Sequence, residues 1–216
     1  MPELPEVEVL VRHLAPLLEG RKIRAVQVRR VKVLAPSSTR EFTRALLGAK
    51  FCGLARRGKY LLFKLCRAKR AEPRTLVGHL GMTGRMYLLP TKARLPKHAA
   101  VVLNLGRESF VFEDTRYFGR LTLDLRALGR LGPEPLGPEF TAERFADALA
   151  RSSQPIKVKL LDQSLLAGVG NIYASEALFR AGIAPTLPAR RKPSATRSVS
   201  GRRPSRRSSP CTRWGC

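Results

Sequence analysis

The sequence has few acidic residues for its length. Its 216 residues include 16 Asp and Glu against 41 Lys and Arg, a formal net charge of +25 at pH 7. Residues 189–216 hold nine of the bases and no acid, so subtracting nine from 41 leaves 32 bases against 16 acids, or +16, in residues 1–188. A basic tail on an ordinary domain therefore does not explain the charge, which indicates a polyanionic partner, most simply nucleic acid.

Long apolar runs are also missing. No stretch of about 18 uncharged apolar residues is present to span a bilayer, although binding to a membrane surface stays open. The N-terminus does not resemble a signal peptide, because Glu3, Glu6 and Glu8 stand where basic residues should lie. We therefore expect a cytoplasmic protein that does not enter a membrane.

Cysteine is scarce, with only Cys52, Cys66, Cys211 and Cys216 in the chain. In a reducing compartment cysteines rarely form structural disulfides. The sequence therefore predicts four thiols and no disulfide framework.

The first two thirds of the chain change from one helical pattern to a β-rich one. Apolar residues recur at three- and four-residue steps between Pro2 and Leu18, which predicts an amphipathic helix ending near Gly20. Glycine-bounded β-rich runs then predict an antiparallel sandwich or barrel, interrupted by a short helix over residues 39–47. The predicted strands are residues 23–33, 60–66, 75–80, 86–89, 100–105, 110–112 and 120–125.

The last third is predicted to be helical. Residues 129–139 contain three glycines and three prolines, which is typical of an interdomain linker. Helices are predicted over residues 142–150, 156–162 and 171–182, and the glycine-containing turn before the last can bring backbone N–H groups against a phosphate. Residues 189–216 lack apolar periodicity and are predicted to be disordered, either a nucleic-acid-gripping arm or a sequence never selected to fold.

The N-terminus carries a possible covalent catalyst. Removal of Met1 would expose Pro2 as a secondary amine beside the Glu3 carboxylate. An α-amine titrates near ~7.7–8.0, so part of it is unprotonated at neutral pH. It can condense with an aldehyde-level carbon to an iminium, which acts as an electron sink. The alternative is a common Met-Pro start in which Pro5 merely begins a helix.

Five blocks together resemble bacterial formamidopyrimidine-DNA glycosylase, the enzyme family that excises oxidised purines. They occur in family order and with sensible spacing, and the resemblance covers about residues 1–188. The blocks are residues 2–8 (PELPEVE), 57–61 (RGKYL), 79–84 (HLGMTG), 114–119 (DTRYFG) and 168–176 (GVGNIYASE).

The resemblance implies a bifunctional glycosylase and abasic-site lyase acting on double-stranded DNA with oxidised bases or abasic sites. Pro2 is the implied nucleophile at the sugar C1′, Glu3 the general acid for the sugar ring oxygen, and Lys59 a further catalytic residue. Without the motif, Lys59 would be taken as a surface charge and Glu3 as a favourable charge in a first helical turn. Arg56 and Arg57 are interpreted as general electrostatic attraction to the DNA backbone.

Base flipping leaves a void in the duplex that costs a few kcal/mol. By resemblance, Met82, Arg116 and Phe118 fill that void, although core packing is the alternative for Met82 and Phe118. The remaining implied DNA-binding residues are His79, His98, Arg116, Lys157 and Asn171; a structural hydrogen bond is the alternative for His79.

The resemblance implies an α+β fold. It consists of an N-terminal helix with an antiparallel β-sandwich catalytic domain (residues 1–128), a linker (129–139), an incomplete helix-two-turns-helix DNA-binding domain (140–188) and a basic tail (189–216). The expected protein is a monomer, C-terminally truncated relative to the family and associated with the bacterial nucleoid.

The chain departs from the family pattern at three places. His98 stands alone where a His-Asp-His pattern is usual, and Tyr117 replaces a common arginine. Family members carry a structural zinc in a four-cysteine finger, but here the chain ends with only Cys211 and Cys216, too few for four tetrahedral ligands. We therefore expect no metal or other cofactor in this chain.

Two alternatives stay open at this point. An endonuclease VIII-type enzyme would prefer oxidised pyrimidines, and a non-catalytic remnant would bind nucleic acid through its basic surface alone. The void-filling set of Met82, Arg116 and Phe118 favours the purine enzyme.

Overall fold

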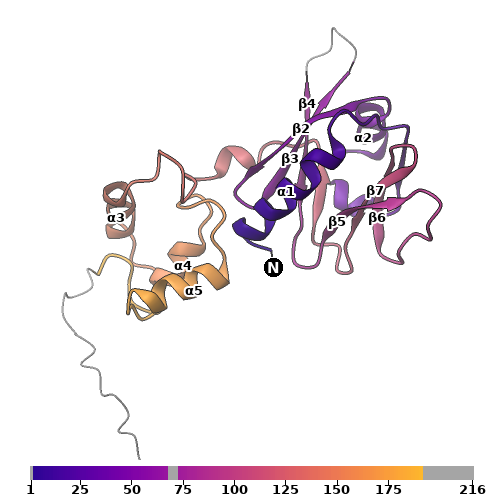
Figure 1. Ribbon diagram of the computed structural model, residues 1–216. Coiled ribbons are helices and arrows are strands. Elements are labelled where there is room, and N and C mark those ends of the chain that lie inside the picture. The colour runs from indigo at the N-terminus through magenta and orange to yellow at the C-terminus, as the bar shows by residue number, and fades with distance from the viewer. Residues whose placement is uncertain (1, 68–72, 192–216) are drawn as a thin grey trace, which may run out of the picture.

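The computed structural model describes residues 2–67 and 73–191 (Figure 1). It opens with helix α1 (Leu4–Leu18), in which the Glu6 carboxylate accepts a hydrogen bond of 2.9 Å from the Glu3 backbone N–H at the helix N-cap. Val7, Val11 and Leu14 are buried on one face of α1, against the sandwich. The periodicity of the sequence predicted this helix to within two residues at its start.

Two antiparallel four-stranded sheets form the sandwich, in the orders β1-β6-β7-β5 and β2-β3-β4-β8. Phe51, Phe63 and Phe110 meet between them, with the rings of Phe63 and Phe110 5.5 Å apart and edge to face. The expected sandwich is therefore confirmed. The strands are β1 (Ala25–Val28), β2 (Lys50–Arg57), β3 (Tyr60–Cys66), β4 (Arg74–His79), β5 (Arg85–Pro90), β6 (Ala99–Asn104), β7 (Glu108–Glu113) and β8 (Arg120–Thr122).

Two parts of the sandwich differ from the prediction. β1 stops at Val28 because the N–H groups of Arg29 and Arg30 both bond to the Ala100 carbonyl, and the chain then turns into a 3-10 helix, η1 (Val31–Leu34). Helix α2 (Thr39–Leu46) follows, as predicted. β2 was not predicted, because a bulge after Phe51 and two terminal arginines break its alternation.

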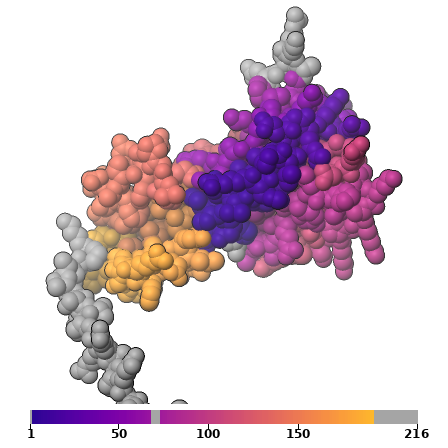
Figure 2. All heavy atoms as spheres, viewed as in Figure 1, coloured from indigo at the N-terminus to yellow at the C-terminus, as the bar shows by residue number. Residues whose placement is uncertain are grey.

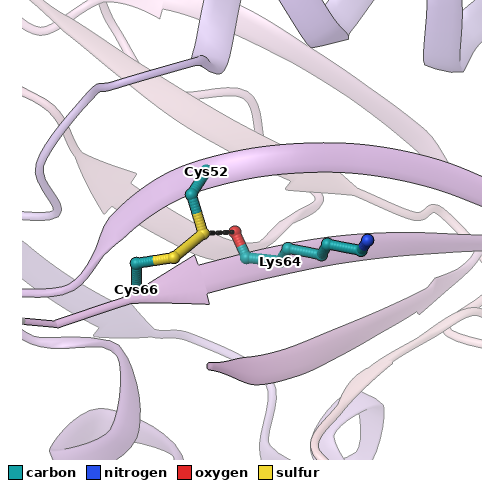
Figure 3. Close-up of a disulfide and its surroundings, with 3 residues drawn as sticks. All are labelled: Cys52, Lys64 and Cys66. Carbon is teal, nitrogen blue, oxygen red and sulfur yellow. Dashed lines mark hydrogen bonds between the residues drawn. A yellow bond between two sulfur atoms is a disulfide. The ribbon is translucent and has the colours of Figure 1, made fainter. Parts of the chain in front are cut away.

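The prediction of four thiols is wrong for Cys52 and Cys66, which form a disulfide (Figure 3). Cys52 lies at the bulge of β2, and Cys66 pairs in register with Lys50 at the end of β3. The hairpin places the two Cα atoms 6.0 Å apart, within the range a disulfide requires. The redox state of a compartment says nothing about which strands pair. Here the pairing of β2 with β3 is what brings Cys52 and Cys66 together.

The helical part follows a short 3-10 helix, η2 (Leu128–Arg130), and contains α3 (Ala142–Ala150), α4 (Ile156–Leu161) and α5 (Asn171–Arg180). A second core gathers Ile156, Leu160, Ala174 and Leu178. Figure 2 shows α1, in indigo, at the junction between the sandwich and this helical part.

The predicted tail begins too early. Ala189 is buried in the second core and its N–H bonds to the Gln154 carbonyl, while Arg190 bonds to Ser152. Residues 189–191 therefore belong to the helical part, and the rest of the predicted tail lies outside the described residues. Across the described ranges, no helix has the length and apolar character needed to cross a membrane.

Candidate functional site

The Glu3 carboxylate lies at the N-terminus of α5, although 167 or more residues separate the partners in sequence. Its Oε2 accepts hydrogen bonds from the N–H groups of Gly170 (2.8 Å) and Tyr173 (3.3 Å), and its Oε1 accepts one from Ile172 (2.8 Å). Glu3 is only 2% exposed. The three donors and the helix dipole balance the buried negative charge and fix the N-terminus of the chain against the helical part.

Gly168 and Gly170 make this contact possible by lacking side chains. A Cβ at Gly170 would overlap the Glu3 carboxyl group, and one at Gly168, where φ is +95°, would lie 2.6 Å from Leu4 Cδ1. The sequence predicted a close approach of this turn to a phosphate. The structure instead gives the N–H groups of Gly170, Ile172 and Tyr173 to the protein's own carboxylate.

Lys59 lies in the turn between β2 and β3, directly after Gly58, and is 6% exposed. Burial lowers the pKa of Lys59, and the nearby Glu3 charge opposes that shift. Pro2, half-buried, is adjacent to Glu3 in the chain. The structure therefore gathers Pro2, Glu3 and Lys59 at the junction of the two parts.

His79 ends β4, and its ring lies 4.8 Å from that of Tyr60. The Gly81 N–H donates to its Nδ1 at 3.2 Å, so a neutral His79 carries its proton on Nε2. Burial, with the charges of Lys59 and Arg120, lowers the pKa of His79 to about 4. At neutral pH its Nε2–H is a donor without a charge.

Replacing His79 with glutamine is expected to remove part of the acid sensitivity of folding. The unfolded histidine takes up a proton below its ordinary pKa of 6.5, but the folded one does so only near 4, so the unfolding free energy falls as pH drops through that window. Between pH 7 and pH 4, the wild-type protein is expected to lose about 3 kcal/mol of unfolding free energy through His79. Urea unfolding at pH 7, 5.5 and 4 measures it, and an equal loss in His79→Gln would contradict this assignment.

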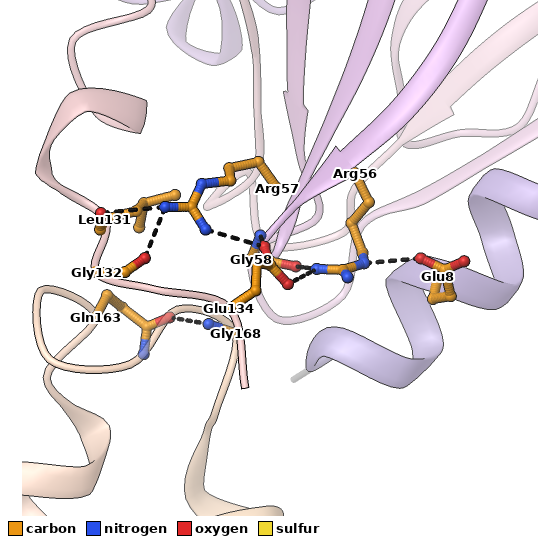
Figure 4. Close-up of polar contacts among 9 residues, drawn as sticks. All are labelled: Glu8, Arg56, Arg57, Gly58, Leu131, Gly132, Glu134, Gln163 and Gly168. Atoms are coloured by element: carbon orange, nitrogen blue, oxygen red, sulfur yellow. Dashed lines mark hydrogen bonds and ion pairs between the residues drawn. The ribbon is translucent and has the colours of Figure 1, made fainter. Parts of the chain in front are cut away.

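The guanidinium groups of Arg56 and Arg57 point toward carboxylate and carbonyl oxygens of the protein (Figure 4). Arg56 pairs with Glu8 at 2.8 Å and with Glu134 at 2.6 Å, and Arg57 pairs with Glu134 at 3.3 Å. Both guanidinium groups are held by carboxylates of the protein itself, which offset the charge that the sequence assigned to attraction of the DNA backbone. No local pattern in the sequence pointed to Glu134.

Met82 and Phe118 project from two touching turns of the sandwich. They are 45% and 49% exposed, which excludes the core-packing alternative. A Cβ at Gly81 would lie 2.6 Å from the Gly119 backbone N, so the two turns are in contact. The Arg116 guanidinium stacks 5.0 Å from the centre of the Phe118 ring. The three side chains thus form one exposed group.

Asp114 joins the turn that carries Met82 to the turn that carries Phe118. Its fully buried carboxylate accepts hydrogen bonds from the Thr83 hydroxyl and from the N–H groups of Arg116 (3.1 Å) and Gly119 (2.7 Å). Burial raises the pKa of Asp114, but these hydrogen bonds outweigh it and leave the pKa below its usual value. Asp114 belongs to the motif at residues 114–119, but nothing in the sequence predicted that it joins the two turns.

Asp114→Asn is expected to destabilise the protein by about 2 kcal/mol or more, because its amide group would face N–H donors and leave one unpaired. Thr83→Val, which removes a single donor and leaves the carboxylate, is expected to cost less. Urea unfolding of both variants measures the difference. Equal stability of Asp114→Asn and wild type would show that the carboxylate does not hold the turns.

Two of the predicted DNA-binding residues lie in the helical part. Lys157 is half-buried on α4, and its backbone N–H bonds to the Pro185 carbonyl. Asn171 is the exposed first residue of α5, one residue beyond Gly170. Asn171 therefore lies at the Glu3 contact, whereas Lys157 is held on a separate helix.

Comparison with known proteins accounts for both parts of the chain. The family model of the formamidopyrimidine-DNA glycosylase N-terminal domain matches residues 1–121, and that of the formamidopyrimidine-DNA glycosylase H2TH domain, the helix-two-turns-helix element, matches residues 131–197. The chain belongs to the formamidopyrimidine-DNA glycosylase family.

Formamidopyrimidine-DNA glycosylase of Moorella thermoacetica is 48% identical over 197 residues, which covers 88% of this chain and 70% of that protein. The enzyme of Carboxydothermus hydrogenoformans is 42% identical, covering 86% of this chain and 67% of its own length. Solved structures of Lactococcus lactis Fpg with DNA containing an abasic site or a FAPY-dG lesion each match with a TM-score of 0.81 at 30% identity, covering 89% of this chain and 71% or 73% of theirs. The fold and family predictions are confirmed.

In this member of the formamidopyrimidine-DNA glycosylase family, the two departures in the sandwich lie together. His98 Nδ1 is 3.3 Å from the Tyr117 hydroxyl, and the Arg30 guanidinium stacks 5.1 Å from the Tyr117 ring centre. Tyr117 has a φ of +55°, which is uncommon for a residue with a side chain. Tyr117 thus supplies a hydrogen-bond partner for the solitary histidine.

The residues described in this family member offer no group of three His, Cys, Asp or Glu side chains that could hold a metal ion. Cys52 and Cys66 are bonded to each other, and Cys211 and Cys216 lie outside the described residues. The residues that the structure places therefore do not fit a four-cysteine zinc site.

Proposed function

We propose that this protein is a base-excision repair glycosylase that removes oxidised purines from double-stranded DNA and then cleaves the strand at the abasic site. The observation that carries the proposal is the Glu3 contact with the N-terminus of α5, which holds the Pro2-Glu3 pair beside the buried Lys59. The family membership and the lesion-containing DNA bound by the solved relatives support the same substrate class.

In the proposed reaction, Pro2 is the N-terminal residue after removal of Met1. Its nitrogen lone pair forms a bond to C1′ of the flipped nucleotide, and the glycosidic bond breaks with its electrons passing to the base, which takes up a proton. The C1′–O4′ bond then opens, O4′ gains a proton, and the amine loses its own proton to give the iminium. Loss of a C2′ proton breaks the C3′–O3′ bond and cleaves the strand, and water releases the sugar.

Glu3 is the proposed proton carrier to O4′. Its Oε2 accepts two hydrogen bonds, but its Oε1 accepts only one, from Ile172, and so retains a lone pair that can take up a proton. The N–H donors fix the carboxyl group, so a proton bound at Oε1 has a defined direction. This orientation is what general acid catalysis requires.

Lys59 is proposed to act at the lesion or its phosphate. Burial lowers its pKa, which makes its neutral form more accessible than that of a surface lysine. The remaining protein groups are proposed to hold the DNA. Met82, Arg116 and Phe118 fill the void, and His79, His98, Lys157 and Asn171 contact the strand.

Excision assays with single lesions test this proposal. The mature protein is expected to release 8-oxoguanine and formamidopyrimidines from duplex DNA and to leave ends typical of elimination. Preferential release of oxidised pyrimidines would indicate the endonuclease VIII type, and binding without any release would indicate a non-catalytic remnant.

We propose that the protein acts as a monomer on nucleoid DNA in the cytoplasm.

A further inference from the structure

The segment 131–134 binds both sides of the site and is here called the strap. Its sequence, Leu131-Gly132-Pro133-Glu134, was predicted to be part of a linker. On one side it contacts the β2–β3 turn that carries Lys59, and on the other the loop 163–170, whose Gly170 N–H donates to Glu3 (Figure 4).

Glu134 makes the contact with the β2–β3 turn. Its Oε1 accepts the Gly58 N–H at 2.6 Å and Arg57 Nη1 at 3.3 Å, and its Oε2 accepts Arg56 Nη1 at 2.6 Å. The second Arg57 nitrogen, Nη2, donates to the carbonyls of Leu131 (3.2 Å) and Gly132 (2.6 Å). One carboxylate thereby fixes the three residues that precede Lys59.

The contact with the loop uses the backbone of the strap. The Gly132 N–H donates to the Gln163 carbonyl at 2.8 Å, and the Ala167 N–H donates to the Pro133 carbonyl at 2.9 Å. The Gln163 side chain then fixes the loop internally, accepting from the Gly168 N–H at 3.0 Å and donating to the Val169 carbonyl at 2.8 Å. The strap is therefore connected to the turn that places Gly170 against Glu3.

Opposite charges alternate in this cluster. Glu134 pairs with Arg56 and Arg57, Glu8 pairs with Arg56 and also with Arg12, and the side chain of Glu134 is 21% exposed. Partly buried ion pairs of this kind are screened less by salt than surface pairs. While Glu134 is in place, both guanidinium groups are engaged by oxygens of the protein, with side-chain exposures of 16% for Arg56 and 30% for Arg57.

We propose that Glu134 is a positioning residue with two effects. It holds the Lys59 turn at a fixed distance from the loop that binds Glu3, and it keeps Arg56 and Arg57 out of nonspecific binding to DNA. This inference rests on the proposed function, because the site that Glu134 positions is the proposed glycosylase site.

Three variants of the full chain separate these effects. Glu134→Gln removes the charge and part of the hydrogen bonding. Glu134→Asp keeps the charge but shortens the reach to Gly58. Asp124→Asn is the matched control, since it changes the net charge equally and breaks the exposed ion pair with Arg126, away from the strap.

Single-turnover excision of 8-oxoguanine from duplex DNA and the salt dependence of Kd are the measurements. Glu134→Gln is expected to lower the rate by on the order of tenfold or more, because small misplacements of reacting groups are costly, and to steepen the slope of log Kd against log salt by about 1 or 2. Glu134→Asp is expected to lower the rate with the wild-type slope. Asp124→Asn is expected to excise within about twofold of wild type.

A purely structural role would lower the melting temperature and the rate without steepening the salt slope, and would overturn the charge-holding half of the proposal. Rates within about twofold of wild type in both Glu134 variants would overturn the positioning half. If wild type itself released no base, the proposed function would fail, whereas an active wild type beside unaffected variants would reject only the inference. Should Glu134→Gln fail to fold, the rate of Glu134→Asp decides the positioning half. The salt slope of Arg57→Gln then decides the charge-holding half, because a guanidinium held by Glu134 makes no phosphate contact and its loss leaves the slope at the wild-type value, whereas a slope shallower by about 1 would overturn it.

Discussion

Glu3→Gln is expected to lower single-turnover excision of 8-oxoguanine by about 10²- to 10⁴-fold, the range associated with loss of a general acid or base. Glutamine has nearly the same shape but cannot deliver a proton to O4′. Its amide group would also face the N–H donors of Gly170, Ile172 and Tyr173, of which only some could be accepted by its single oxygen. Both losses arise at one carboxyl group.

The stability and chemical effects of Glu3→Gln can be separated. Leaving buried donors unpaired costs about 1–3 kcal/mol, so the melting temperature is measured beside the rate. Asp124→Asn is the control, because it also replaces a carboxylate with an amide but contacts neither Glu3 nor the α5 N–H groups, pairing instead with Arg126. A Glu3→Gln protein that is folded and excises at the wild-type rate would remove Glu3 from the mechanism.

A protein with one additional residue before Pro2 is expected to lose covalent chemistry almost completely. Its proline nitrogen would be an amide and would have no lone pair available for attack at C1′. We expect strand cleavage to fall by at least about 10³-fold, a change of roughly 4 kcal/mol in the barrier. DNA binding is expected to stay within a few-fold of the mature protein, since the basic surface is unchanged.

Mass spectrometry of the intact N-terminus is the control for this comparison, because retained Met1 would block the mature protein in the same way. Cleavage by the extended protein at the mature rate would show that another amine attacks the sugar. Lys59 is the candidate in that case, since burial lowers its pKa toward the nucleophilic form.

Local patterns predicted most of the elements. The helical period defined α1, and glycine-bounded apolar runs located β3, β4 and β6 to within one residue at each end. β2 could not be found in this way, because its bulge and terminal arginines disrupt the alternation. The disulfide was missed for the same reason, since it depends on the register of β2 and β3.

The sequence pointed to candidate site residues but not to the contacts between them. The motifs pointed to Glu3, Lys59 and Gly170 separately, but nothing local shows that the Glu3 carboxylate binds the N-terminus of α5. The same holds for Arg56 and Glu134, which pair across 78 residues. Which distant charges pair is decided by the fold and cannot be seen in a local pattern. Arg56 and Arg57 were therefore interpreted only through their positive charge.

Borohydride trapping tests the central claim most directly, because it converts an iminium into a stable bond. The mature protein, mixed with an abasic-site or 8-oxoguanine duplex and borohydride, is expected to form a covalent adduct, and peptide mass analysis is expected to place the added sugar on residue 2. No adduct from folded protein with a verified Pro2 terminus, or an adduct on Lys59 instead, would contradict the account.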